Sequence, residues 1–308
     1  MALIIGVDVG GSHVSSAAVD NENFKIIPNT YFTGIVDNKS SKEIIFSKWA
    51  AVINKTIEKC PQDKIQIAFS MPGPFQYETG RAMFEGNDKF EALYNVVIPD
   101  EFSKYITSGK NISFRFLNDA SSFGIGSSLL NGLDKKVRKV VAITLGTGFG
   151  ASFLDSTVPL TSGENIPENG CLWDKIFQDG IADEFFSIRW FIKKYEEYSG
   201  SQITDGVKEV SYKNDDFSRR VFEEFAHNFS AFLLPFLNNF NCNTLVLGGN
   251  IAKCHALFLP KVLQIWKDNN CEIEVIILEN TEESSIIGAS NMFNKLFWSK
   301  VKVALPSF

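Results

Sequence analysis

The sequence predicts an α/β protein built from two related domains with a ligand cleft between them. An apolar β-branched run at residues 3–7 passes through adjacent glycines into small residues at 14–19, a pattern that predicts a β-hairpin. The same order of apolar strand, glycine turn and small-residue strand returns at 140–154. Two copies, each starting an α/β unit, indicate a duplicated fold whose two glycine turns face one cleft.

Composition supports two globular domains. The 308 residues are enough for two separate cores, and 44% hydrophobic with 21% charged residues is ordinary for a globular chain. The formal charge of −6 argues against a nucleic-acid or anionic-membrane surface. No apolar run approaches a membrane span, and the N-terminus leads into a strand instead of a basic leader. We therefore expect a cytoplasmic protein without nucleic-acid or membrane partners.

The first hairpin places an acid directly before its glycine turn. Asp8 precedes Gly10, Gly11 and Ser12, whose N–H groups and hydroxyl suit a phosphate chain. A carboxylate that faces phosphates needs a cation between them, so Asp8 is predicted to hold Mg²⁺, directly or through water. The dinucleotide G-x-G-x-x-G and the Walker Gly-Lys-Ser/Thr are both missing. An ordinary hairpin with a Gly-Gly turn is the alternative.

The next elements lead to polar residues at the carboxyl edge of the first sheet. The predicted elements are a strand within 23–33, a helix at 41–59, a strand at 65–70, a helix at 102–108 and a strand at 112–117. The strand at 65–70 ends at Pro72, Gly73 and Pro74, where open α/β sheets bind ligands. A polar loop with Asn87 and Asp88 follows, and its side chains can bind hydroxyls.

A further acid lies at a strand end. Asn118 and Asp119 follow the strand at 112–117 and precede small, helix-compatible residues at 120–124. At this position Asp119 can cap the helix or act as a general base. The hinge between the domains is expected near 118–133.

The second half carries two more glycine turns. The strand at 140–145 enters Gly146, Thr147 and Gly148, and the strand at 244–247 enters a Gly-Gly-Asn turn that opens a helix. The latter arrangement lets backbone approach a flat ligand such as adenine and ribose. The other predicted elements are helices at 181–198, 216–240, 259–267 and 282–298 and a strand at 272–278.

Together these motifs resemble the ROK family of sugar kinases and repressors, within the actin-like ATPase superfamily, over nearly the whole chain. Residues 8–13 are similar to its first phosphate motif, D-x-G-G-T-K, 144–150 to its second and 247–251 to its adenosine motif. Residues 72–74, with Asn87, look like its sugar loop, and 118–120 like its N-D-A, whose Asp is the catalytic base.

The resemblance implies a two-domain actin-like ATPase fold, a duplicated ribonuclease H-like unit with ATP and sugar in the interdomain cleft. The implied domains are 1–118, joined by a C-terminal helix at 289–308, and 119–288. The implied reaction is ATP-dependent phosphorylation of a hexose, glucokinase-like and at the 6-hydroxyl, with Asp119 as base, Mg²⁺ as cofactor and a homodimer as the assembly.

The site residues implied by the resemblance fall into two sets. The ATP set is Asp8, Gly10, Gly11, Ser12, Thr144, Gly146, Thr147, Gly148, Gly248, Gly249 and Asn250. The sugar set is Pro72, Gly73, Asn87, Asp88, Asn118, Asp119 and Glu164.

The chain departs from the family pattern in two places, the segment after the second phosphate motif and the end of the first motif. The family's G-E-x-G-H and its zinc-binding cysteine motif are reduced to Gly163–Pro167 and a single Cys171, and the five cysteines of the chain form no C-x-x-C pair. We therefore expect no structural zinc. Trp173 replaces an expected acid, and His13 replaces the usual Lys of the first motif.

Two other functions are open. The first is a catalytically silent sugar-binding or regulatory protein of the family. Repressors of the family carry an extra N-terminal helix-turn-helix, whereas this chain begins at the first hairpin, so DNA binding is not expected. The second is an ATPase with a non-sugar acceptor such as acetate, which the matches at Pro72 and at Asn118 and Asp119 disfavour.

Overall fold

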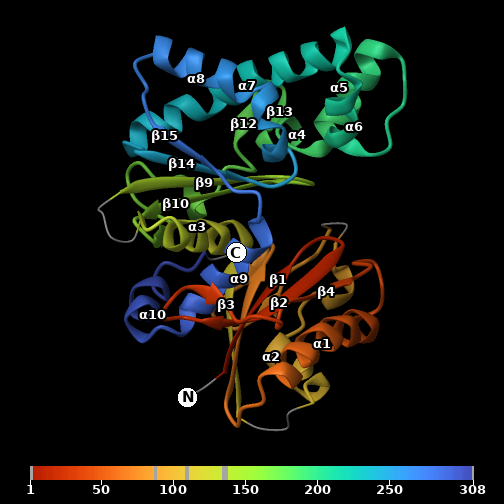
Figure 1. The fold of residues 1–308 in the computed structure, drawn as a ribbon, viewed down its shortest axis with the longest axis vertical. Coiled ribbons are helices and arrows are strands. Elements are labelled where there is room, and N and C mark those ends of the chain that lie inside the picture. The colour runs from red at the N-terminus through yellow and green to blue at the C-terminus, as the bar shows by residue number, and fades with distance from the viewer. Residues whose placement is uncertain (1–2, 87–88, 108–110, 134–137, 307–308) are drawn as a thin grey trace.

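The fold was analysed in a computed structural model, which describes residues 3–86, 89–107, 111–133 and 138–306. Its two large sheets come one from each half of the chain, and helices lie between them (Figure 1). Among these residues no helix is both long and apolar enough to cross a bilayer.

The first sheet begins with the predicted hairpin. Its strands are β1 (Leu3–Val9), β2 (His13–Asp20), β3 (Lys25–Ile26), β4 (Phe32–Ile35), β5 (Ile65–Met71) and β8 (Ile112–Asn118). The order is β3-β2-β1-β5-β8, with β4 also paired to β2. Strands β1, β5 and β8 are parallel, and their register sets Asp8 beside Ser70 and Met71 beside Asn118. The carboxyl ends of three strands therefore meet at one edge.

The second sheet repeats this plan. Its strands are β9 (Lys139–Leu145), β10 (Phe149–Asp155), β11 (Val158–Leu160), β14 (Thr244–Gly248) and β15 (Glu274–Ile277). The order is β11-β10-β9-β14-β15, with β9 and β10 antiparallel and β9, β14 and β15 parallel. An antiparallel hairpin followed by parallel strands occurs in both sheets, which confirms the predicted duplication.

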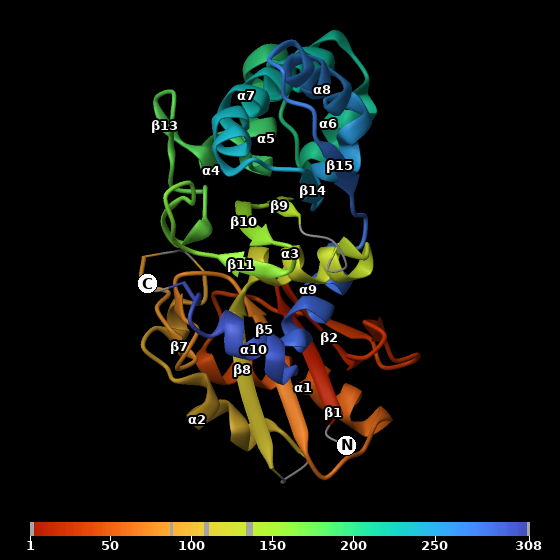
Figure 2. The ribbon, with the colours of Figure 1, turned by 90° about the vertical axis from the view of Figure 1, so that its left-hand side faces the viewer.

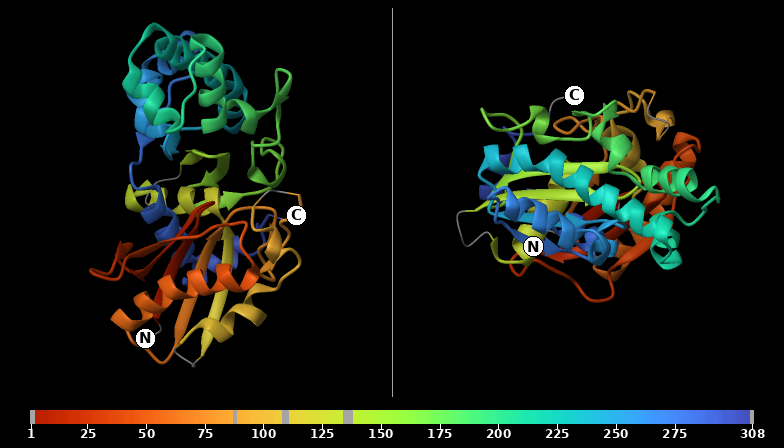
Figure 3. Two further views of the ribbon diagram at one scale, coloured as in Figure 1. Left: turned by 90° about the vertical axis from the view of Figure 1, so that its right-hand side faces the viewer. Right: turned by 90° about the horizontal axis from the view of Figure 1, so that it is seen from above.

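Helices cover the outer faces of both sheets (Figure 3). The first half contributes α1 (Lys42–Lys59) and α2 (Ile98–Phe102), and the second contributes α4 (Ala182–Phe185), α5 (Ile188–Ser199), α6 (Gly206–Lys213), α7 (Asp216–Phe240) and α8 (Leu259–Asp268). Short elements are β6 (Phe75–Gln76), β7 (Arg81–Ala82), β12 (Ile176–Phe177), β13 (Gly180–Ile181) and the 3₁₀ turns η1 (Glu91–Leu93), η2 (Ser103–Tyr105), η4 (Glu168–Gly170), η5 (Ala252–Leu257) and η6 (Asn291–Phe293). Phenylalanines fill the core beneath α7, where Phe225 stacks on Phe229 with ring centroids 5.5 Å apart.

Several predicted element bounds were wrong. The strand expected within 23–33 is two short strands, because Asn29 takes a left-handed φ of 62° between them. The helix expected at 181–198 breaks at extended Ser187. The helix expected at 102–108 is a 3₁₀ turn after α2, and α6 was not predicted. The Gly-Gly-Asn turn leads into a helix as predicted, and that helix is the 3₁₀ helix η5.

The helix expected at 282–298 is also divided. It consists of α9 (Thr281–Ser290), η6 and α10 (Lys295–Val301). The division falls at Asn294, which has extended backbone and whose side chain accepts hydrogen bonds from the N–H groups of Leu296 and Phe297. An asparagine in this position starts a new helix instead of continuing the old one.

Two helices cross between the sheets (Figure 2). Helix α3 (Asp119–Leu130) packs on β9 and β10, α9 packs on β1, β2 and β5, and the two contact each other closely. A Cβ on Gly126 would lie 1.8 Å from the Ser284 carbonyl oxygen, and one on Gly288 would lie 1.9 Å from that of Ser122. Backbone therefore meets backbone at this crossing. The division into domains 1–118 and 119–288 stays a prediction.

Replacing Gly126 with alanine should destabilise the protein by about 3 kcal/mol, because the added methyl group forces α3 and α9 apart along their length. Gly132→Ala is the control. Gly132 takes positive φ (65°), unlike the helical Gly126, and a Cβ there meets nothing within 4 Å. The control should cost only about 1 kcal/mol for the strained backbone. Denaturant unfolding measures both, and equal losses would contradict the tight crossing.

Candidate functional site

A cleft of about 1340 Å³ lies between the two sheets. Its lining comes from the carboxyl ends of the parallel strands, from the glycine turns of both hairpins and from the start of α9. The duplicated topology explains this composition, because each sheet turns the same edge toward the other.

Most of the predicted site residues line this cleft. These are Asp8, Gly10, Gly11, Ser12, Pro72, Gly73, Asn118, Asp119, Thr144, Gly146, Thr147, Gly148, Gly249 and Asn250. Gly248 lies beneath its turn instead, where a Cβ would be 2.6 Å from the ring of Phe123. Asn87 and Asp88 lie outside the described residues.

The structure does not place Glu164 in the cleft. Its side chain is exposed, and Asn169, Cys171 and Trp173 of the same segment line the cleft instead. The cause is a sharp turn in which Asn169 and Gly170 both take positive φ (56° and 66°). Glu164 therefore lies outside the cleft lining of this structure, and its contact with the sugar stays a prediction.

Asp8 lies where the two hairpins approach each other. Its Oδ1 accepts a hydrogen bond of 2.8 Å from the Ser70 hydroxyl, the residue beside it on β5. The pKa of Asp8 is raised to about 7, chiefly by enclosure in protein and also by the nearby carboxylates of Asp119 and Glu282, although the hydrogen bond from Ser70 lowers it. Excess negative potential at this point favours a cation.

The residues around Asp8 fit Mg²⁺ if bound phosphates and water supply the remaining oxygen ligands. Among the described residues, no group of three or more His, Cys, Asp or Glu side chains could hold a metal by itself. Mg²⁺ usually takes one or two protein carboxylates and completes its shell with water and substrate phosphates. Asp8 beside two glycine loops is such a partial site.

Asp119 is the first residue of α3, but its neighbour supplies the helix cap. Asn118 Oδ1 accepts a hydrogen bond of 3.2 Å from the Ser121 N–H, while its amide donates to the Tyr77 hydroxyl at 3.2 Å. Asp119 Oδ1 accepts from the Ala120 N–H at 2.8 Å. Burial raises the pKa of Asp119, and the charge of Lys89 opposes that rise. A carboxylate with this pKa shift can take up a proton near the cleft.

Two residues that sequence reasoning missed anchor the second glycine turn. Asp183 accepts a hydrogen bond of 2.7 Å from the Phe149 N–H and pairs with Arg189 at 2.5 Å. Arg189 also donates to the Thr147 carbonyl oxygen at 2.6 Å. The two residues lie on α4 and α5, on either side of the break at extended Ser187. No motif spacing signals this pair, because it lies within what reads as one amphipathic helix.

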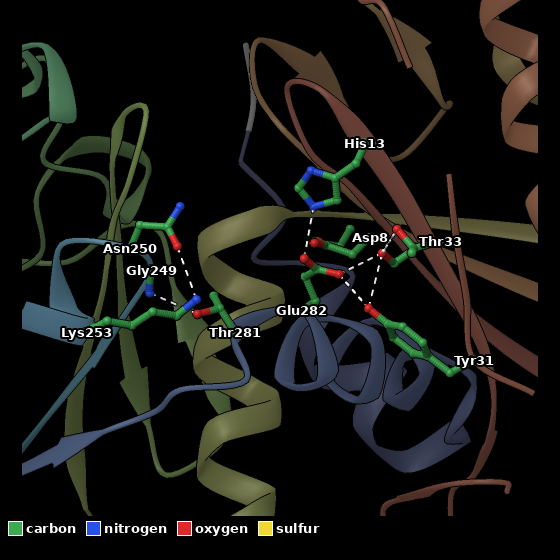
Figure 4. A network of polar contacts seen from close by, with 11 residues as sticks. Asp8, His13, Tyr31, Thr33, Gly249, Asn250, Lys253, Thr281 and Glu282 are labelled. Atoms are coloured by element: carbon green, nitrogen blue, oxygen red, sulfur yellow. Dashed lines mark hydrogen bonds and ion pairs between the residues drawn. The ribbon is translucent and has the colours of Figure 1, made fainter. Parts of the chain in front are cut away.

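The third glycine turn is fixed by its backbone. Gly249 has φ +94°, and a Cβ there would lie 2.3 Å from the Leu145 carbonyl oxygen. Its N–H donates to the Thr281 hydroxyl at 2.8 Å (Figure 4). Only glycine fits this close approach, which presents the turn to the cleft.

Glu282 was also missed, although it joins three segments. Its Oε2 accepts hydrogen bonds from the Ser15 hydroxyl at 2.7 Å and the Tyr31 hydroxyl at 2.6 Å, and its Oε1 lies 3.1 Å from His13 Nε2 (Figure 4). The contact with His13 lowers the pKa of Glu282 to about 2. The same contact raises the pKa of His13. Both shifts favour the charged form of each group.

The end of the cleft near Pro72 and Asp119 contains residues absent from the prediction. Lys89, Phe84, Cys171 and Trp173 all line it. Trp173 is a large apolar residue that is 45% exposed where it lines the cleft. All five cysteines are free thiols. The expected absence of zinc stays a prediction.

Comparison with known proteins identifies the family. A model of the ROK family matches residues 4–295. No curated protein is found to match the chain. The solved structures that match include a ROK family glucokinase from Streptomyces griseus in complex with glucose and AMPPNP, with 16% identity over 94% of this chain and 99% of that one and a TM-score of 0.73.

Two further structures have the same fold. A ROK hexokinase from Thermus thermophilus matches with 14% identity over 93% of this chain and 96% of that one, at a TM-score of 0.72. A ROK family transcriptional regulator, a homolog of the E. coli MLC protein, matches with 13% identity over 97% of this chain and 80% of that one, also at 0.72. These likenesses confirm the predicted two-domain actin-like ATPase fold. Because the family model covers nearly all of the sequence, the chain belongs to the ROK family.

Proposed function

We propose that this protein is an ATP-dependent sugar kinase that phosphorylates a hexose, glucokinase-like and at the 6-hydroxyl. The observation that carries the proposal is the meeting of Asp8, two glycine turns and Asp119 in one cleft. The glycine turns suit a phosphate chain, and a carboxylate with a raised pKa suits a general base.

Each group has a physical role in this reaction. Phosphoryl transfer depends mainly on positioning and charge stabilisation, which the N–H groups of the glycine loops and the hydroxyls of Ser12 and Thr147 supply. Asp8 would hold Mg²⁺, which neutralises phosphate charge when bound. Asp119 accepts the proton of the attacking sugar hydroxyl. Approach of the two domains expels water that would compete as nucleophile.

We assign the nucleotide and the sugar to opposite ends of the cleft. Gly249 and Asn250 receive the adenosine, with Gly248 supporting their turn from beneath. Pro72, Gly73 and Asn118 receive the sugar, and Asn169, Lys89 and Trp173 join them in place of Glu164. We further propose a cytoplasmic homodimer, on family grounds alone.

The alternative is a catalytically silent sugar-binding or regulatory protein. The fold does not separate it from a kinase, because a regulator and kinases match this chain equally well. The complete set of Asp8, Asp119 and two glycine loops favours the kinase. Sugar-dependent ADP release, measured with Mg·ATP across hexoses and N-acetylhexosamines, separates the two. Release with one sugar supports the kinase, whereas calorimetric sugar binding without ADP release supports the silent binder.

Lys89→Met is expected to raise the acceptor KM about tenfold with little effect on the ATP KM, because Lys89 is the cation at the acceptor end and a hydrogen bond from a charged group contributes about 1.5–3 kcal/mol. Lys253→Met is the matched variant at the other end, where Lys253 Nζ lies 3.2 Å from Asn250 Oδ1. It should raise the ATP KM instead. Steady-state kinetics with each substrate varied tests both, and the same effect of both variants on the two KM values would contradict the assignment of the ends.

A further inference from the structure

The first turn of α9 contacts loops from both halves of the cleft. Thr281 accepts the hydrogen bond from Gly249 of the second half, and the next residue, Glu282, contacts His13, Ser15 and Tyr31 of the first half. Figure 4 shows these as two adjacent networks that meet at the start of the helix. Two consecutive residues therefore connect the turn proposed for adenosine with the hairpin proposed for phosphate.

Glu282 is held more firmly than a surface carboxylate. Hydroxyl groups of Ser15 and Tyr31 donate to one oxygen, and the other oxygen faces His13. Asp8 and Tyr31 are the other titratable groups that act on His13 or Glu282 from neighbouring strands and loops. Two contacts from β2 and one from Tyr31, just before β4, orient the carboxylate, and it constrains His13 in turn.

His13 lies directly against the first glycine loop. A Cβ on Gly10 would lie 2.7 Å from the imidazole Cε1, and the Gly10 N–H donates to the His13 carbonyl oxygen at 2.9 Å. Both the ring and the backbone of His13 therefore shape this loop. The His13 side chain is 36% exposed and lines the cleft.

We propose that Glu282 and Thr281 are positioning residues for the nucleotide: Glu282 holds the His13 imidazole at the edge of the first glycine loop, and Thr281 holds the Gly249 turn. The inference rests on the proposed function for the identity of the ligand. It assigns to α9 a role in binding both ends of the nucleotide through one helical turn.

A simple electrostatic view predicts the opposite result for Glu282. A carboxylate beside a phosphate site repels the ligand, so its removal would tighten binding. If Glu282 acts by positioning His13, its removal weakens binding. The sign of the change in ADP affinity therefore shows whether Glu282 acts by repelling the phosphates or by positioning His13.

The test is calorimetric binding of Mg·ADP, which does not depend on turnover. Glu282→Gln and His13→Gln should each weaken binding about tenfold, and the double variant should weaken it no further, because the two residues act as one unit. Thr281→Val should also weaken it. His13→Lys, which keeps a cation opposite Glu282, should stay within about threefold of wild type. The exposed Glu272→Gln is the control and should match wild type.

Kinetics and folding controls complete the experiment. In the variants the ATP KM should rise while kcat and the acceptor KM stay within about threefold, a division that general loss of structure would not produce. Melting curves check that each variant folds. If Glu282→Gln does not fold, Tyr31→Phe removes one donor to the same carboxylate and should weaken Mg·ADP binding about two- to threefold.

The outcomes separate this inference from the proposed function. Unchanged or tighter Mg·ADP binding by Glu282→Gln, or additive losses in the double variant, would overturn the inference even if the protein is a kinase. Weaker binding by Glu282→Gln in a protein that phosphorylates no sugar would support the inference and overturn the function. A wild-type protein that binds no Mg·ADP would overturn both.

Discussion

Replacing Asp119 with alanine is expected to lower turnover by about two to four orders of magnitude while sugar binding persists. The reason is that Asp119 is the carboxylate placed to accept the proton of the attacking hydroxyl, whereas neighbouring Asn118 supplies the helix cap. Loss of Asp119 therefore removes the base without removing the cap. Coupled ADP-release kinetics measures the loss, and calorimetry with the sugar measures what remains.

The pH dependence of kcat/KM is a second test of Asp119. Burial raises the pKa of Asp119 above its ordinary 3.8, and a general base acts only when deprotonated. The wild-type kcat/KM should therefore fall on acidification at a higher pH than an ordinary aspartate would give. The residual activity of Asp119→Asn should lack this limb. Near-full activity in the variant, or an unchanged acid limb, would exclude Asp119 as the base.

Asp8→Asn is expected to abolish most Mg²⁺-dependent activity, by at least about a hundredfold, and yet to stabilise the protein at neutral pH. The first effect follows from losing the carboxylate proposed to hold Mg²⁺. The second follows from the pKa of Asp8, which enclosure by protein raises from 3.8 to about 7. A function-bearing residue that costs stability is the expected trade-off at such a site.

The sign of the stability effect depends on pH. Because the folded pKa of Asp8 exceeds the unfolded value, the folded protein binds an extra proton between about pH 4 and 7, and the free energy of unfolding falls as pH rises through that window. Asparagine at position 8 does not titrate, so this fall in the free energy of unfolding is absent from the variant. Two effects limit the gain in stability. Part of Asp8 is open to the cleft, and the hydrogen bond from Ser70 becomes weaker when asparagine replaces the carboxylate. The gain should therefore be about 1 kcal/mol, or about 2–4 °C in melting temperature.

Melting temperatures across this pH window test the prediction, with exposed Asp179→Asn as the control. The gain of Asp8→Asn over the control should be present near pH 7.5 and vanish near pH 4. A gain that is independent of pH, or a loss at neutral pH, would show that the Asp8 carboxylate is not destabilised by its surroundings.

Local patterns made the fold and part of the site predictable. The two hairpins are encoded by contiguous strand and glycine-turn signals, and Asp119 follows its strand directly, so each could be found within a short stretch. Parallel strands bring their carboxyl ends to one edge, which is why residues as distant as Asp8 and Asn118 could be expected in one cleft.

The missed residues depend on contacts between distant segments. Glu282 meets Ser15 across 267 positions of the chain, and no local spacing reveals such a pair. Asp183 and Arg189 lie on two helices divided at Ser187, a division that the helical pattern of the sequence does not reveal. The position of Glu164 depends in the same way on backbone that the sequence does not reveal, since Asn169, in the left-handed turn, and Cys171 and Trp173 after it line the cleft, whereas Glu164 does not.

The most direct test of the central claim is to follow the γ-phosphoryl group itself. Wild-type protein is incubated with Mg·ATP labelled in the γ-phosphate and with the sugar that gives the fastest ADP release, and the labelled products are separated. We predict that the label appears in a sugar phosphate, at the 6-position, and that Asp119→Asn prevents its formation. Label found only in inorganic phosphate, or retained in ATP with every sugar, would contradict the assignment of this cleft as a sugar kinase site.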